Sequence, residues 1–413
     1  MESITFQNTM AAIDYVKIRN EDCSEIHKAH APIGIARPSA NNVHHDRLVV
    51  DGHVSIPSLM ATVGEDASIC HVVTEMFQLS REEAAKLKVK SVVGGNTNKL
   101  YHVSGIPSSS SFPESVLLRI FGGHGMIDRD IETSTYAALA KQGIALPYYG
   151  RFGNGRLEGW CPNGHHLQVR ELSQPHFSLE IARATARLHS KFVIPPELQQ
   201  HHNPQASPTL WTQLESWLDQ ALASTFMNEN DTKRAAKLPL AQLKQELVWL
   251  KQHVCNSTTT AKVAFCHNDL LAANILRYGD DGKGSEKIQL IDFEYGGMNY
   301  AAYDIANHFN EFAGGTNAED NATPDYSLFP SPQLQHDFCR AYLQECGEKY
   351  DDEAVQQLLV QIKGFVLANH LVWGLWAINQ AATEGCQGFD YLHYGSCRIN
   401  RYFFEKQEWE STR

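Results

Sequence analysis

The chain has 413 residues, of which 43% are hydrophobic, and a formal net charge of −12 at pH 7. This length allows a large core and predicts two lobes or domains. The negative charge disfavours nucleic acid and anionic membranes as partners and is compatible with a cationic small molecule. The nine cysteines include no CxxC pair, which favours reduced thiols and a cytoplasmic location.

No basic-then-apolar leader begins the chain. The most apolar stretch, Gly364–Ile378, contains Asn369 and His370 and is shorter than the roughly 20 residues that span a bilayer. We therefore expect no integral membrane segment. The oligomeric state is left open, with a homodimer as one expectation.

The first part of the chain predicts a strand-rich lobe at 46–158, after an N-terminal extension of uncertain order at 1–45. Apolar residues at one-face spacing predict a helix over Ala67–Ser80, and Ser80 has the character of a cap for a further turn. Three strands are predicted next, followed by a helix that Gly143 ends and a strand pair joined by a Gly-Asn-Gly turn. These elements are Val89–Val93, Lys99–Val103, Ser115–Phe121, Asp130–Gln142, Tyr148–Phe152 and Arg156–Trp160.

The second part, 159–413, predicts a large and mainly helical lobe. Helices are expected over Leu179–His189, with Ser178 as a cap, and again from Leu334 to about Tyr402. Two further helices are predicted at Leu210–Thr225 and Leu240–His253. The fold class is therefore α+β and bilobal, with a small antiparallel-sheet lobe before a larger helical one.

Two neighbouring motifs are the most informative part of the sequence. FCHNDLLAANIL, from Phe265 to Leu276, places Asn274 five positions after Asp269, and IQLIDFEY ends a strand-like segment at Asp292. This spacing is typical of phosphoryl transfer in protein-kinase-like folds. It predicts that Asp269 accepts or orients the attacking hydroxyl, and that Asn274 and Asp292 hold Mg²⁺ against the phosphates of ATP.

Ordinary structural roles remain alternatives for single residues. An aspartate such as Asp269 can simply stabilise a turn, but the two motifs together favour a site. His267 and Asn268 are expected to brace the loop through hydrogen bonds to the backbone, and Asp304 to bond backbone N–H groups below it. Glu294 is interpreted either as a residue near the metal or as an exposed strand-end glutamate.

With these motifs and NYAAYDIANHFNEFA (299–313) in view, the chain resembles the choline/ethanolamine kinase family over roughly residues 85–405. GGNTNKL, LLRIFG and LANHLVWGLWAINQA, at 94–100, 117–122 and 367–381, carry the same resemblance. NHFNEFAG and DYSLFP are closer to the ethanolamine branch. The resemblance implies transfer of the ATP γ-phosphate to ethanolamine. The product is phosphoethanolamine, the first intermediate of the CDP-ethanolamine route to phosphatidylethanolamine.

The nucleotide is expected to bind in the first lobe. Short polar residues after a Gly-Gly pair can bind phosphate oxygens through a turn. Arg119 lies where protein kinases carry a strand lysine, and Glu132 is its expected partner, although an ordinary ion pair is the alternative. Adenine would lie near Glu158–Cys161, where Gly159 departs from the larger polar residue typical of choline kinases. The turn residues are Asn96, Thr97, Asn98 and Lys99.

The amine is expected to bind in the second lobe. Trp373 and Trp376 share one helix face, and aromatic faces attract a desolvated ammonium by about 2 kcal/mol in favourable cases. Two such tryptophans are more often core residues, and the resemblance favours the amine site. Glu311 is expected to supply a carboxylate to the ammonium. Other aromatic positions of the family's amine pocket match Tyr326, Phe389 and Tyr394.

Three alternatives remain beside an ethanolamine kinase. The first is a choline kinase or an enzyme that uses both amines. An aminoglycoside-type phosphotransferase shares the spacing of Asp269, Asn274 and Asp292 but has no need of the WGLW segment. The last is an inactive nucleotide-binding scaffold, which the retention of all three residues argues against.

Overall fold

The computed structural model describes residues 48–50, 53–92, 98–107, 112–122, 128–203, 208–255, 261–279 and 286–411. The chain divides into two compact units. Described residues within Met1–Arg129 and Leu146–Pro162 form the first unit. Those within Asp130–Ala145 and Asn163–Arg413 form the second, so a single helix between strands of the first unit belongs to the second. The predicted extension at 1–45 lies outside the described residues.

The first unit is built on one seven-stranded sheet with the order β1-β2-β6-β7-β5-β4-β3. Neighbouring strands in this sheet are antiparallel, except that β2 and β6 run parallel with Val54 opposite Gly150. All the predicted strands are confirmed, and the first two strands were not predicted. The strands are β1 Leu48–Val50, β2 His53–Ile56, β3 Lys88–Val92, β4 Lys99–Ser104, β5 Ser115–Ile120, β6 Tyr148–Phe152 and β7 Gly155–Gly159.

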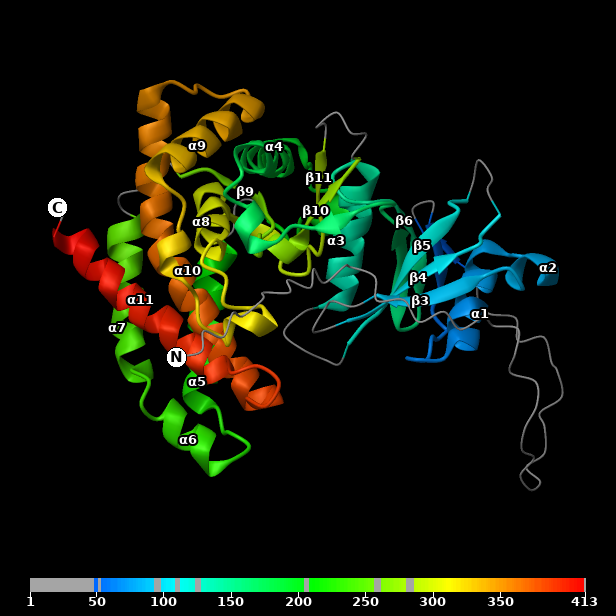
Figure 1. Ribbon diagram of the computed structural model, residues 1–413, viewed down its shortest axis with the longest axis horizontal. Helices are drawn as coiled ribbons and strands as arrows, with labels where there is room; N and C mark the ends of the chain where they lie inside the picture. The colour runs from blue at the N-terminus through cyan, green and yellow to red at the C-terminus, as the bar shows by residue number, and fades with distance from the viewer. Residues whose placement is uncertain are drawn as a thin grey trace, which may run out of the picture. The chain divides into compact units, whose positions relative to one another are not determined.

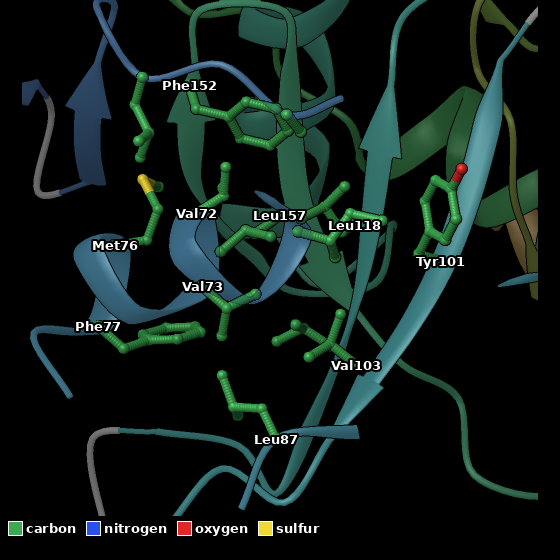
Figure 2. Close-up of a cluster of buried hydrophobic side chains, with 14 of the residues drawn as sticks. Val72, Val73, Met76, Phe77, Leu87, Tyr101, Val103, Leu118, Phe152 and Leu157 are labelled. Atoms are coloured by element: carbon green, nitrogen blue, oxygen red, sulfur yellow. The ribbon is translucent and has the colours of Figure 1, made fainter. Parts of the chain in front are cut away.

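Helix α1 (Asp66–Phe77) covers this sheet with the predicted apolar face. Ile69, Val72, Val73, Met76 and Phe77 are all buried, and the last four are seen in Figure 2 against side chains from the strands. Because these residues recur every three or four positions, they gather on one side of the helix. The strand partners labelled in Figure 2 include Tyr101, Val103, Leu118, Phe152 and Leu157.

The predicted Ser80 cap is also confirmed. Helix α2 (Arg81–Ala84) begins with a capping box in which the Ser80 hydroxyl accepts from the Glu83 N–H and the Glu83 carboxylate accepts from the Ser80 N–H. The two side chains thus accept hydrogen bonds from two backbone N–H groups that would otherwise have no partner at the start of the helix.

The second unit is mainly helical, as predicted. In Figure 1 the orange helix α10 runs through it, in contact with the yellow α8 and the red α11. Its helices are α3 Arg129–Lys141, α4 Pro175–Lys191, α5 Thr209–Ala223, α6 Glu229–Ala235, α7 Leu240–Leu250, α8 Ala301–Glu311, α9 Pro332–Cys346, α10 Asp352–Glu384 and α11 Tyr391–Ser411.

Two small sheets hold the FCHND and IQLIDFEY motifs of the second unit in place. β9 (Val263–Cys266) pairs antiparallel with β12 (Gly297–Tyr300). β10 (Ile275–Tyr278) lies between β11 (Lys287–Leu290) and the short β8 (His165–His166). The FCHND motif therefore leaves one sheet and enters the other, and IQLIDFEY returns from the second sheet towards the first.

By length and composition, helix α10 could cross a membrane, but 72% of its most apolar 18-residue segment is buried within the structure. That is the behaviour of a core helix, and it accounts for the apolar stretch noted in the sequence. Its buried surface contacts α5, α8, α9 and α11.

Three predicted details of the second unit were wrong or incomplete. Ser178 does not cap a helix, because α4 already begins at Pro175, and proline suits the first helical position where no N–H is needed. Helix α6 was not predicted. The helix predicted to reach His253 is α-helical only to Leu250 and continues as a π-turn over Lys251–Cys255.

Candidate functional site

The loop between β9 and β10 brings two of the predicted residues together. Asp269 is 8% exposed, and the amide nitrogen of Asn274 donates to both its carbonyl oxygen and its carboxylate Oδ2, each at 2.9 Å. A short 3₁₀ turn, Ala272–Asn274, closes the loop. The five-residue spacing thus returns the amide to the carboxylate, and the Asn274 oxygen is the atom that can serve a cation.

Two residues of the loops have a left-handed backbone. Asn268 has φ 65° and Asp292 has φ 62°. Asparagine and aspartate tolerate this conformation better than most side chains, and such conformations cluster at functional sites. Their placement is braced by hydrogen bonds across the two motifs.

The bracing roles predicted for His267 and Asn268 are confirmed. The Nε2 of His267 lies 2.8 Å from the carbonyl oxygen of Ile291, and the Asn268 amide donates to the Tyr295 carbonyl oxygen at 2.9 Å. Burial lowers the pKa of His267, so the neutral ring donates from Nε2. These two bonds tie the FCHND segment to the backbone on both sides of Asp292.

The negative charges of three other acidic residues act on the buried carboxyl of Asp269. Burial raises the pKa of Asp269 well above its usual range, and the negative charges of Glu311, Glu294 and Asp292 raise it further. A divalent cation near these oxygens would offset that repulsion. Carboxylate and amide oxygens are also the ligands that Mg²⁺ prefers, so the donor set of Asn274 and Asp292 fits Mg²⁺. Glu294 is half-buried and belongs to this charge cluster.

Asp304 supports the loop from below, as predicted. Its two carboxylate oxygens accept the backbone N–H groups of His267 and Asn268 at 2.8 Å, and His189 Nε2 lies 2.9 Å from Oδ2. Burial alone would raise the pKa of Asp304, but the bond from His189 and the nearby charges lower it. The Sγ of Cys266 lies close enough to the ligand atoms of His189 and Asp304 for the three residues to hold a metal ion. However, the carboxylate oxygens already accept hydrogen bonds, and the thiol points to backbone carbonyls.

The aromatic residues predicted for the amine form a chain of ring contacts. Trp373 and Trp376 meet edge-to-face with centroids 5.5 Å apart. Trp376 meets Tyr391, which meets Phe389, which in turn lies 5.8 Å from Tyr394. The structure therefore brings together four of the five predicted aromatic side chains and adds Tyr391.

Tyr295, from the IDFEY motif, connects this aromatic chain to the acidic cluster. Its ring lies 5.7 Å from Trp373, and its hydroxyl accepts a hydrogen bond from Trp376 Nε1 at 3.1 Å. Burial raises its pKa, and the charges of Glu294 and Asp269 raise it further. The phenol therefore remains protonated between the two groups of residues.

Tyr326 is placed differently from the other aromatic residues. Its ring lies edge-on to His370 with centroids 5.7 Å apart, and the guanidinium of Arg401 lies 4.6 Å from its centroid. Burial raises its pKa to about 12, and the nearby charge of Arg398 opposes that shift. Its predicted contact with substrate stays a prediction.

Glu311 lies at the end of α8 and is almost fully buried. Its Oε1 is 3.4 Å from the guanidinium of Arg398, which also donates to the Tyr394 hydroxyl at 3.0 Å. Burial raises the pKa of Glu311, while Arg398 opposes that shift. The predicted carboxylate is therefore joined through Arg398 to the aromatic chain.

In the first unit, Arg119 forms a buried ion pair, the alternative role expected for it, with Glu158, a partner that the sequence did not predict. Arg119 and Arg156 both donate from Nε to Glu158 Oε1 at 2.7 Å. Burial alone would raise the pKa of Glu158, but the two arginines lower it to about 2. Glu132, the partner predicted for Arg119, is buried on α3 in the second unit, and that pairing stays a prediction.

The other predicted nucleotide residues are only partly described. Asn96 and Thr97 lie outside the described residues. Asn98 is buried and accepts the Gly122 N–H at 3.3 Å, whereas Lys99 is exposed at the start of β4. Close packing explains the glycine at position 159, because a Cβ there would lie 2.6 Å from Pro147 Cδ.

Several residues of the site were missed. Tyr295 lay within a motif already singled out, so its position beside the acidic cluster was accessible from the sequence. Tyr391 and Arg398 carry no motif of their own, and Asn369 lies within LANHLVWGLWAINQA without having been predicted as a site residue. They are single polar or aromatic residues on helices, and only the packing of α8, α10 and α11 brings them together.

Comparison with known proteins gives the family. The choline/ethanolamine kinase family matches residues 89–403. Ethanolamine kinase 1 of Homo sapiens is 32% identical over 91% of this chain and 79% of its own length. Probable choline kinase 3 of Arabidopsis thaliana is 30% identical over 79% of this chain and 88% of its own length.

Solved structures show the fold. A Plasmodium vivax ethanolamine kinase superposes with a TM-score of 0.69 at 24% identity, covering 84% of this chain and 92% of its own. This likeness confirms the predicted α+β protein-kinase-like fold, with a sheet-based first part and a mainly helical second part. From the extent of the family match and the identity with its curated members, the chain belongs to the choline/ethanolamine kinase family.

Proposed function

We propose that this chain is a Mg²⁺-dependent ethanolamine kinase, which transfers the ATP γ-phosphate to ethanolamine and gives phosphoethanolamine. The observation that carries the proposal is the geometry of the Asp269 loop, in which the Asn274 amide nitrogen donates to the Asp269 carboxylate at 2.9 Å and Asp304 holds the Asn268 N–H at 2.8 Å. Glu311 is a second buried carboxylate of the same unit, and its negative charge helps to raise the pKa of Asp269. Ethanolamine has a hydroxyl and an ammonium two carbons apart, so neighbouring carboxylates suit its two ends.

In this proposal the residues divide the work between the two ends of the substrate. Asp269 accepts a hydrogen bond from the substrate hydroxyl and orients its oxygen towards the phosphoryl group, which needs positioning more than a strong base. Asn274 and Asp292 would hold the cation, whose charge neutralises the phosphate oxygens. Asn96, Thr97, Asn98, Lys99, Arg119 and Glu132 are proposed to hold the nucleotide.

The amine end is proposed to bind at Glu311 and the aromatic chain. A primary ammonium has three N–H donors that need acceptors, whereas a quaternary ammonium has none. Trp373, Trp376, Phe389 and Tyr394 supply ring faces and apolar contact, and Tyr326 is proposed to contribute a further ring. The Glu311 carboxylate favours ethanolamine over choline.

A choline kinase or an enzyme with both activities is the second candidate, because the aromatic chain also suits a quaternary ammonium and one of the relatives is named a choline kinase. The seven cysteines whose side chains the structure describes are free, which supports a proposed cytoplasmic location. A homodimer remains part of the proposal.

Steady-state kinetics with both amines test the proposal. We expect kcat/KM for ethanolamine to exceed that for choline, by about tenfold or more, because a desolvated carboxylate that receives N–H donors discriminates strongly against a ligand without them. Coupled ADP release at saturating Mg–ATP measures both. A higher kcat/KM for choline would reverse the substrate assignment, and ADP release driven by neither amine would favour the inactive scaffold.

A further inference from the structure

Arg398 is a fully buried arginine on α11 that has no place in the proposed chemistry so far. Its side chain is 0% exposed. Charged side chains are almost never fully buried unless they are paired, because removing the charge from water is costly. Its nearest acid is Glu311, the residue proposed to receive the ammonium.

The guanidinium of Arg398 is divided between three acceptors. Nη1 lies 3.4 Å from Glu311 Oε1 and donates to the Tyr394 hydroxyl at 3.0 Å, and Nη2 donates to Asn369 Oδ1 at 2.6 Å. Its charge also lies 5.7 Å from the centroid of the Tyr394 ring. The long contact to Glu311 and the short one to Asn369 show that the guanidinium is anchored on α10 and reaches the carboxylate from there.

Asn369 extends this anchor to the aromatic chain. Its amide nitrogen donates to Asn307 Oδ1 at 2.8 Å, and the same oxygen accepts from Trp373 Nε1 at 2.7 Å. Asn307 and Asn369 are both fully buried. One continuous set of hydrogen bonds therefore fixes both the Glu311 carboxylate and the Trp373 ring, from three different helices.

We propose that Arg398 is a positioning residue for amine recognition. It holds Glu311 through Oε1, so that Oε2 is left in a fixed direction for an N–H of the ammonium. Because the acceptor oxygen is held in one direction, the carboxylate binds a primary ammonium, which has N–H donors, more strongly than a quaternary one. This inference rests on the proposed function and deepens it by naming the residue that sets the orientation of the acceptor.

A simpler role in stability makes a different prediction. If Arg398 only satisfied buried groups, its replacement would lower the melting temperature and the concentration of active enzyme, without changing the preference between amines. If Arg398 acts through Glu311, its replacement changes KM for the amine, changes it more for ethanolamine than for choline, and leaves KM for ATP unchanged.

The test uses Arg398→Met, Glu311→Gln and the double variant, with kinetics for both amines and a melting temperature for each protein. For Arg398→Met we expect KM for ethanolamine to rise about 10- to 100-fold, with a smaller rise for choline and kcat within about threefold of the parent. The double variant should match Glu311→Gln alone, since coupled residues are not additive. It also removes both charges of the pair, so it should fold even if Arg398→Met does not.

Tyr402→Phe is the matched control. Tyr402 lies on the same helix, is fully buried, and donates to Glu246 Oε2 at 2.6 Å, and it is not among the partners of Glu311 or Arg398. This variant should keep the parent KM values whatever its melting temperature.

Two results would overturn the inference. One is an equal rise in KM for both amines on Arg398→Met, and the other is a further rise when Arg398→Met is added to Glu311→Gln. A parent enzyme that phosphorylates neither amine would instead refute the proposed function, and this inference with it. The two failures are thus distinguishable, because the first appears only in the variants.

Discussion

Asp269→Asn is expected to lower kcat by about 10²- to 10⁴-fold, the range that a positioned acid–base group contributes. The amide keeps the shape of the side chain. It lacks the negative charge with which the carboxylate accepts the substrate proton or orients the hydroxyl. KM for ATP should change little, because the proposed phosphate and cation ligands remain. Single-turnover measurement of phosphoethanolamine formation separates this loss from any effect on product release.

The same substitution is expected to stabilise the protein. The pKa of Asp269 in the folded chain is raised by burial and by Glu311, Glu294 and Asp292, so the folded state binds a proton more tightly than the unfolded state. Stability therefore falls as the pH rises from the unfolded pKa through the folded one, and an uncharged amide avoids that loss. In the absence of Mg²⁺ and nucleotide, Asp269→Asn should melt at or above the parent temperature at pH 8. Parent-like turnover would refute the assigned role.

Asp304→Asn is expected to lower both stability and turnover. Asp304 holds two backbone N–H groups and His189 in a region that excludes water. An amide would turn a donor towards one of those donors, and a buried donor left without an acceptor costs about 1–3 kcal/mol. Chemical denaturation measures the loss of unfolding free energy, and kcat should fall because the Asp269 loop loses its support.

Asp231→Asn is the control for this variant. Asp231 is also a buried aspartate, which accepts from Asn228 and Arg234 at the start of α6. Its replacement should cost stability while leaving kcat and both KM values unchanged. If Asp304→Asn also kept the parent kcat, the loop would not depend on its carboxylate.

The two substitutions differ in a way that separates chemistry from support. If a substitution removes activity but leaves stability equal or greater, as expected for Asp269→Asn, the charge of the original side chain destabilises the fold and serves the reaction. Loss of both marks a group that the fold requires. Asp269 and Asp304 lie in the same region of the second unit, so the contrast does not arise from different parts of the protein.

The elements that were predictable from the sequence are those with strong local signals. The one-face spacing in α1 gave all five buried residues, and Ser80 with Glu83 formed the expected cap. The five-residue offset from Asp269 to Asn274 predicted their contact, because a tight loop has few ways to return its end to its beginning. Asp292 and Glu311 were placed by motif and by resemblance, and the structure brings their charges to Asp269.

The elements that were not predictable depend on distant parts of the chain. The edge strands β1 and β2 are short, and β2 pairs with β6 about a hundred residues later. Asn369 is next to His370 in the apolar part of α10, and Arg398 is one of many polar residues on α11, so no local pattern distinguishes a ligand from a buried structural group. Ser178 failed as a cap because α4 begins three residues earlier, at Pro175, and proline suits the first helical position.

The most direct test of the account is a crystal structure with Mg²⁺, a non-hydrolysable ATP analogue and ethanolamine. We expect oxygens of Asn274 and Asp292 at about 2.0–2.1 Å from the metal, the ethanolamine hydroxyl within hydrogen-bond reach of the Asp269 carboxylate, and the ammonium at Glu311. A metal bound by other residues, or an ethanolamine hydroxyl turned away from Asp269, would contradict the account.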